Sequence, residues 1–329
     1  DQFSFLVDAG LEELFSKRRR SELEALAGSG VEESGVEGGL SSEQAGQMIR
    51  TVTRRARRRT SDSADVAKII DRLNGLAGSE LVAAVKLELK AVLMSPTFLY
   101  RGLLMTRERG QQQPVDDFEL AERLSYFLWA DMPDERLLEL AEAGRLHEPA
   151  VVAEEIDRLL KSAKSRSLAE VFGVEWLSLN EIEHVSDNPP VMLALKSQPI
   201  DFLNDLFTQQ RPLLELIDSD TAFINPHTAK YYGADARQMT QYRRQKGIEV
   251  EAVPNQKIRL EKSTERGGIL TMPGVLAMNR GPIIRGTWIL ERILGQELPD
   301  PPANVGQVQP NRSGENLSFR QRFEQHRSN

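Results

Sequence analysis

Residues Leu120–Trp129 have the sequence Leu-Ala-Glu-Arg-Leu-Ser-Tyr-Phe-Leu-Trp, and Met132-Pro133-Asp134-Glu135 follows two residues later. Asp116 and Glu119 stand just upstream, at the spacing of an N-cap and a carboxylate that reaches back to the cap amide. The proline of the second run is expected in the first turn of another helix, because a missing N–H costs nothing there. Gly144 is suited to end that helix. The run therefore predicts two helices joined in an αα-hairpin.

Apolar residues recur at helical spacing over most of the remaining chain. Pro199 interrupts one such segment, and a kink or a break is expected there. Apolar and polar residues alternate around 246–262, which allows a small β-hairpin. The sequence therefore predicts a mainly α fold of helical bundles and helical hairpins, with further helices over 1–27, 43–59, 80–94, 151–160, 168–179, 191–209 and 283–294.

The 329 residues exceed the size at which a single core stops growing, so several packed modules are expected. Glycine, serine and proline mark the breaks between helical patterns. We divide the chain into an N-terminal helix with a Gly/Ser-rich linker, a helical module, a four-helix module, a helical module with the hairpin, a helical module with a proline arm, and a C-terminal segment. Their residues are 1–45, 46–110, 111–190, 191–262, 263–310 and 311–329.

Composition excludes several classes of function. Lys plus Arg number 42 against 49 Asp plus Glu, and the net charge of −7 disfavours nucleic acid as a partner. The chain has no cysteine, which excludes disulfides, thiolate metal sites and covalent haem attachment within it. The four histidines are far apart in sequence, so no helical His-based metal site is expected. No apolar run approaches the roughly 20 residues that span a bilayer.

Some residues leave a structural and a functional interpretation open. The five arginines at positions 54, 55, 57, 58 and 59 form either an anion site or a solvated helix face neutralised by nearby acids. The acidic pairs of 116–117 and 131–134 are better explained by helix capping than by the opposed carboxylates of a glycosidase. Arg280 and Arg285 flank a glycine-proline helix start where an anion could bind, and His227 and Tyr231 could join them.

Four separated stretches, taken in order, resemble the large multi-domain proteins of planctomycetes and related bacteria that combine domains of unknown function with c-type cytochrome segments. The resemblance covers roughly residues 45 to 329. The stretches are Leu93–Arg101, Leu120–Leu146 with its continuation to Trp176-Leu177, Arg266–Leu270 with Arg285–Glu291, and Leu294-Gly295 with Pro301–Val305.

In that family the segment equivalent to Phe319–Asn329 leads into a Cys-x-x-Cys-His haem-attachment motif. The resemblance therefore implies that 311–329 is the start of a truncated haem-associated segment, with haem c in the missing neighbouring segment. It also implies an exported, periplasmic or extracellular protein, and His326 as an axial ligand of the haem or a neighbour of one. The expected partner is a haem-bearing domain of the same protein or a redox partner.

The leading hypothesis is a helical scaffold in an exported c-type-cytochrome-like electron-transfer protein, which positions haem domains outside this chain. The family supplies no reaction, so no catalytic residue follows and the chain alone is not expected to be an enzyme. The competing hypothesis is an extracellular enzyme or ligand-binding module with an anion or polymer site near Arg280, Arg285, His227 and Tyr231. That site requires these four side chains to converge.

Overall fold

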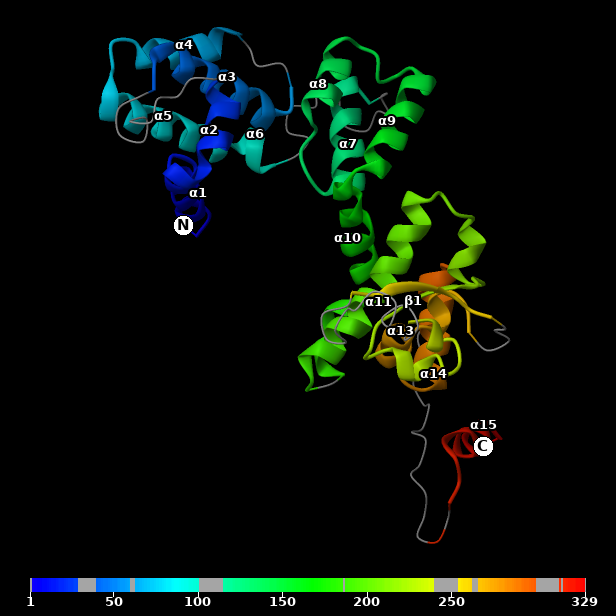
Figure 1. The fold of residues 1–329 in the computed structure, drawn as a ribbon. Helices are drawn as coiled ribbons and strands as arrows, with labels where there is room; N and C mark the ends of the chain where they lie inside the picture. The colour runs from blue at the N-terminus through cyan, green and yellow to red at the C-terminus, as the bar shows by residue number, and fades with distance from the viewer. Residues whose placement is uncertain are drawn as a thin grey trace. The chain divides into compact units, whose positions relative to one another are not determined.

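The computed structural model describes residues 2–28, 40–59, 63–100, 115–185, 187–239, 254–261, 266–299, 314 and 316–328. The chain forms two compact units, Asp1–Val275 and Leu276–Asn329. Helices dominate the described residues and the sheet they contain is small, which confirms the predicted fold class (Figure 1). The finer division into six segments stays a prediction.

The N-terminal helices form a bundle around one apolar cluster. Ser41 begins α3 with a capping box, because its hydroxyl accepts from the Gln44 N–H while its own N–H donates to the Gln44 side chain. Met48, Ile49 and Val85 are fully buried between the helices. The elements are α1 Gln2–Leu14, η1 Lys17–Arg19, α2 Arg20–Ala27, α3 Ser42–Arg57, α4 Ser63–Leu73, α5 Gly78–Leu93 and α6 Pro96–Leu99.

The predicted αα-hairpin is present as α7 Asp117–Trp129 and α8 Glu135–Glu142, and α9 Pro149–Lys161 follows. Asp116 caps α7, as expected, by accepting from the Glu119 N–H at 2.8 Å. The prediction for Pro133 is wrong, because it precedes the helix and Asp134 is the N-cap that accepts from Leu137 N–H at 3.1 Å. Apolar side chains from all three helices share one core.

The next helices pack closely. They are α10 Arg166–Trp176 and α11 Pro189–Thr208, with the short turns η2 Ala163–Ser165, η3 Leu179–His184 and η4 Leu213–Leu216 around them. α11 runs through Pro199 without a break, so one of the two expected alternatives is absent and the kink stays a prediction. Because proline has no backbone N–H, Pro199 cannot donate to the Leu195 carbonyl one turn earlier in the helix. The backbone of Gly274 approaches this same carbonyl, and a Cβ on Gly274 would lie 2.2 Å from the oxygen.

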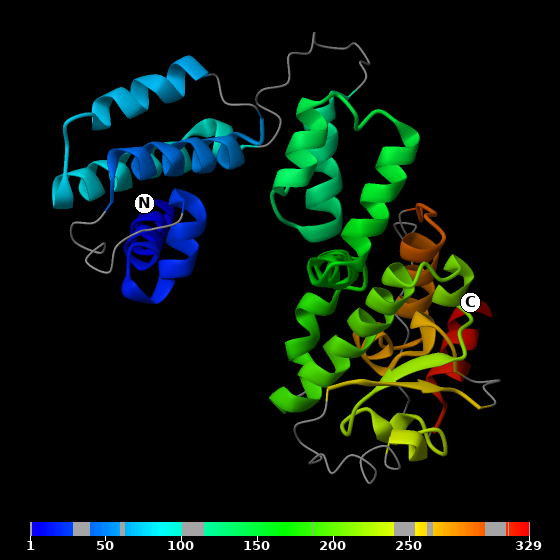
Figure 2. The same cartoon turned by 45° about the horizontal axis from the view of Figure 1, so that its top comes forward.

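The small sheet pairs two strands from distant parts of the first unit. β1 Thr221–Ile224 and β2 Gln256–Arg259 are antiparallel, with Ile224 opposite Gln256 (Figure 2). β2 lies within the range predicted for a hairpin, but its partner is the segment 221–224 rather than a neighbouring strand. The part of that predicted hairpin between 246 and 253 lies outside the described residues. Ala222, Ile224 and Ile258 form a small core of their own.

The remaining elements are one short turn after β1 and the helices and turns that follow β2. They are η5 Ala229–Tyr231, η6 Ile269–Thr271, α13 Pro273–Met278, α14 Pro282–Trp288, the π-helical turn η7 Ile289–Ile293, and α15 Phe319–Ser328. The helix predicted over 283–294 is present as α14 and η7 together. One more helix, α15, follows it in the chain. Most of the predicted linker of 28–42 and of the proline arm lies outside the described residues.

Candidate functional site

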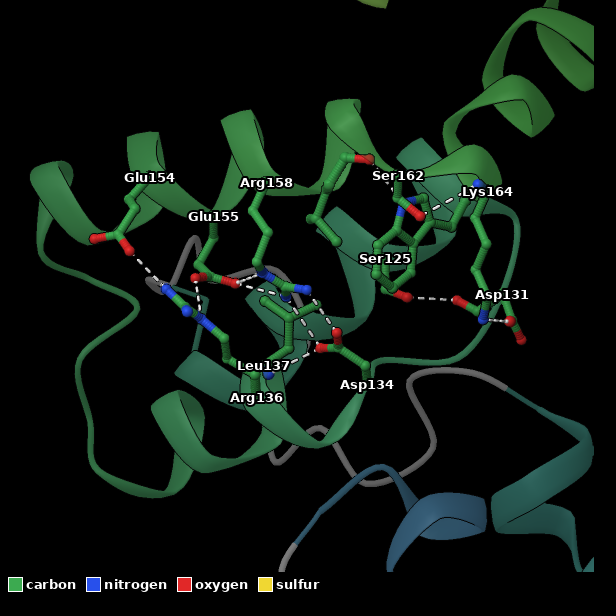
Figure 3. Close-up of polar contacts among 12 residues, drawn as sticks. Ser125, Asp131, Asp134, Arg136, Leu137, Glu154, Glu155, Arg158, Ser162 and Lys164 are labelled. Carbon is green, nitrogen blue, oxygen red and sulfur yellow. Dashed lines mark hydrogen bonds and ion pairs between the residues drawn. The ribbon is translucent and has the colours of Figure 1, made fainter. Parts of the chain in front are cut away.

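A buried carboxylate joins the helices of the α7–α9 bundle. The Glu155 side chain is fully buried, and it accepts from Arg136 Nε at 2.6 Å and from Arg158 Nε at 2.7 Å (Figure 3). Arg158 also donates two hydrogen bonds to Asp134, the cap of α8, at 2.7 and 3.1 Å. Since a buried charge is costly unless it is paired, this network holds α8 against α9.

A second set of contacts fixes the end of α7. The indole N–H of Trp129 donates to the carbonyl of Leu159 at 2.9 Å, and the Lys164 ammonium lies 5.2 Å from the ring centroid. Lys164 also pairs with Asp131 at 2.5 Å. Burial opposes ionisation of Asp131, but the hydrogen bonds from Lys164 and from the Met132 N–H, together with the charge of Lys164, outweigh it and lower the pKa of this carboxyl. These polar groups are used inside the bundle, which suits a rigid support rather than a reaction centre.

A half-open pocket of about 510 Å³ lies along one face of α11. Its lining comes from α11, from the start of α10, and from the segments that follow β1 and precede β2. The lining residues are Arg166, Pro190, Leu193, Ala194, Ser197, Asp201, Asn225, Pro226, His227, Pro254 and Asn255. Ligand sites in proteins are typically clefts of this size with a few convergent polar groups.

Hydrogen bonds link the polar groups of this pocket into a chain. Arg166 pairs with Asp201 at 2.7 Å, and the Asn255 amide donates to Asp201 and to Ser197 at 2.8 and 2.9 Å. The Asn225 amide in turn donates to the Asn255 side-chain oxygen at 2.8 Å. Burial lowers the pKa of Arg166, but its bonds to Asp201 and Glu170 outweigh that effect and raise it. The polar groups of the pocket are therefore held in place before any ligand arrives.

The structure places His227 on the wall of this pocket. The side-chain oxygen of Asn225 accepts from the backbone N–H groups of His227 and Thr228 at 2.9 and 3.2 Å, which fixes the turn that presents the imidazole. Tyr231 does not line the pocket; it is part of η5, with Lys230 lying 5.0 Å from its ring centroid. Its neighbour Tyr232 is buried, and burial raises the pKa of that phenol to about 12.

The other predicted site residues belong to the second unit. Arg280 precedes α14 and donates to the carbonyl of Ala277 at 3.3 Å, and Arg285 lies within α14. His326 is part of α15, and its side chain is outside the described part of the structure. The shared site of Arg280, Arg285, His227 and Tyr231 stays a prediction, as does the role of His326.

The arginine-rich end of α3 is neither an anion site nor a fully solvated face. Arg58 is 2 % exposed, and its guanidinium donates to the carbonyls of Thr97 and Phe98 at 2.8 and 3.2 Å. It also pairs with Glu122 of α7 at 3.3 Å. Arg54 and Arg59 extend the same junction, through ion pairs to Glu135, Glu142 and Asp116. The expected neutralisation by acids is confirmed, while the burial of Arg58 was missed.

Sequence reasoning also missed most of the pocket. Arg166, Asp201 and Asn255 lie in separate segments, and no local pattern marks them as neighbours. One usable signal was present, since an asparagine before a proline indicates a turn that would hold His227 in a fixed position. Within the described ranges, no three histidine, aspartate or glutamate side chains gather closely enough to hold a metal ion. Among the described helices, none is long and apolar enough to cross a bilayer.

Comparison with known families identifies two stretches. Residues 115–234 match PSD4, described as a protein of unknown function (DUF1592), and residues 266–329 match PSCyt3, described as a protein of unknown function (DUF1588). The chain therefore contains two stretches similar to domains of unknown function. The DUF1592 stretch includes the α7–α9 bundle and every pocket residue from Arg166 to His227. Searches of curated proteins and of solved structures found no match.

Proposed function

We propose that this chain is the helical scaffold of an exported c-type-cytochrome-like electron-transfer protein, and that it positions haem domains outside these residues. The observation that carries the proposal is the pair of matches in order, PSD4 followed by PSCyt3. The second name abbreviates a planctomycete cytochrome-associated domain. The ion pairs inside the α7–α9 bundle favour a scaffold role, because the charges that form them are already matched within the bundle.

The donor set of the chain does not fit a covalently held haem. A c-type haem needs two cysteine thiols and an axial histidine, and the chain has four histidines but no cysteine. The haem would therefore belong to a neighbouring segment, with His326 as a residue that contacts it.

The test is expression of the whole gene product together with c-type haem maturation machinery. The expected result is a Soret band that survives denaturation, in the exported fraction, whereas residues 1–329 alone give none because they cannot form thioether bonds. If the whole gene product carries no covalent haem, the electron-transfer proposal is wrong. A change in the Soret spectrum on replacing His326→Ala would support its role as a ligand; an unchanged spectrum would remove it.

A further inference from the structure

The pocket along α11 is lined by both apolar and polar residues. The apolar part of its lining includes Pro190, Leu193 and Pro226, and Leu193 is 69 % exposed. Proline rings present C–H surfaces and lose little conformational entropy when a ligand packs on them. The polar part of the lining includes the linked side chains of Asp201 and Asn255. A ligand that fills the pocket therefore needs both an apolar face and hydrogen-bonding groups.

The polar residues of the pocket present hydrogen-bond acceptors and donors next to one another. Asp201 Oδ1 lies 2.7 Å from Arg166 Nη2, and Asn225 Nδ2 lies 2.8 Å from Asn255 Oδ1. A ligand atom placed beside either pair must accept from one partner and donate to the other. A hydroxyl group does both through one oxygen, whereas an amide needs two separate atoms. Each of the two side-chain pairs can therefore hydrogen-bond to a single ligand hydroxyl, which accepts from one partner and donates to the other.

The charges of the pocket disfavour ionic ligands. Arg166 is shared between Asp201 and Glu170, at 2.7 and 2.8 Å, so its charge is already compensated. An added anion would meet the carboxylate of Asp201, and an added cation would meet the guanidinium of Arg166. The neutral form of the His227 imidazole has one nitrogen that donates and one that accepts, and the charged form has two donors; a ligand hydroxyl can pair with either form.

We propose that this pocket binds a saccharide unit. Its hydroxyls would bridge the Arg166–Asp201 and Asn225–Asn255 pairs, and its C–H face would pack on the prolines and Leu193. The volume of about 510 Å³ lies within the range of small-molecule sites. The proposal is independent of the haem hypothesis, because it rests on residues of the first unit alone.

The first experiment is saturation-transfer NMR on the full chain with glucose, galactose, xylose, maltose and cellobiose. N-acetylalanine methylamide serves as the amide probe. Inorganic phosphate serves as the ionic probe and, because it has no carbon-bound protons, its binding is measured by its displacement of the saccharide signal and by isothermal titration calorimetry. The expected result is a saturable signal for at least one saccharide with a dissociation constant of about 10 mM or lower, as a small shallow site would give. No saccharide signal, or tighter binding of phosphate or of the amide, would overturn the proposal.

The second experiment places the signal in the pocket. Asp201→Asn would set an amide NH₂ against one of two donors, either the Arg166 guanidinium or the Asn255 amide, and Leu193→Asp would place a charge on the apolar wall. Both changes should weaken saccharide binding about tenfold, which is the loss of one hydrogen bond or one apolar contact. Leu213→Asp is the matched control, because Leu213 is 70 % exposed and does not line the pocket.

Circular dichroism must show that all three variants keep the helical content of the parent chain. Because Leu193 is a surface residue, its variant is expected to fold even if Asp201→Asn does not. Equal saccharide affinity in the parent, Leu193→Asp and Leu213→Asp would show that the sugar binds elsewhere and would refute the assignment.

Discussion

At the residue scale, Gly274 has no space for a side chain. Its added Cβ would lie 2.2 Å from the Leu195 carbonyl oxygen, which is a backbone atom of α11 and cannot move aside as a side chain does. We expect Gly274→Ala to lower the free energy of unfolding by about 1–3 kcal/mol, the usual cost of overpacking. Urea denaturation followed by circular dichroism measures this loss.

Gly10→Ala is the control for that prediction. Gly10 lies within α1, and nothing is within 4 Å of its added Cβ. Because alanine favours the helix over glycine, this change should stabilise the chain by about 0.5–1 kcal/mol. If both alanine variants unfold at the same urea concentration as the parent, close packing at Gly274 does not limit the fold.

Tyr232 makes stability sensitive to high pH. Burial raises its pKa to about 12, so the folded state keeps the phenol protonated while the unfolded chain ionises near its usual value of about 10. The contribution is complete below pH 10 and is lost as the pH rises toward 12. We expect a fall of about 2 kcal/mol in the free energy of unfolding over that range.

This prediction is checked by urea denaturation at a series of alkaline pH values in the parent, Tyr232→Phe and Tyr231→Phe. The Tyr232→Phe chain lacks the titrating group and should lose about 2 kcal/mol less between pH 10 and 12. Tyr231 is more exposed, so its variant should follow the parent. An identical alkaline loss in all three chains would contradict the assignment to Tyr232.

At the element scale, the Glu155 network decides whether α8 and α9 stay together. Glu155→Gln removes the charge that faces Arg136 and Arg158, both of which are partly exposed. We expect a loss of about 1–3 kcal/mol, less than for a fully buried pair because solvent screens both arginines. Glu154→Gln is the control, since Glu154 is exposed and pairs with Arg136 alone. Equal losses in the two variants would show that burial of Glu155 adds nothing.

Arg58 has the corresponding role at the end of α3. Arg58→Ala would leave the carbonyls of Thr97 and Phe98 without their donor and Glu122 without its paired cation. We expect a loss of about 2–4 kcal/mol, because Arg58 is buried and its three partners are partly shielded from water. Arg55→Ala is the matched control on the same helix, at an exposed position. Thermal melting of the two variants checks the difference, and a melting temperature unchanged by Arg58→Ala would contradict it.

At the scale of the whole molecule, the excess of acidic residues predicts whether the chain binds polyanions such as DNA. The net charge is −7, and arginines 54, 58 and 59 are held in ion pairs within the protein. We expect no retardation of duplex DNA at about 0.15 M salt, because the chain is negatively charged overall and these arginines already face carboxylates. An electrophoretic mobility assay tests this. Binding that weakens steeply with added salt would show that a basic surface has been overlooked.

The large-scale organisation follows from short-range rules in the sequence. Helical periodicity predicted the bundles, and the Asp116 cap and the Gly144 stop placed the αα-hairpin almost to the residue. Local rules misplaced the start of α8, where two neighbouring residues could each set the beginning of the helix. Pro133 suits the first turn of a helix, but the Asp134 carboxylate that caps the Leu137 N–H sets the start instead.

The sequence by itself determined that the chain is helical, acidic, free of cysteine and related to domains of unknown function, because spacing, charge and composition are local or additive properties. Only the tertiary structure decided that Arg58 is buried, that β2 pairs with β1, and that Arg166, Asp201 and Asn255 meet beside His227. Contacts between distant segments depend on how whole helices pack, and that packing is a cooperative property that no single stretch of sequence contains.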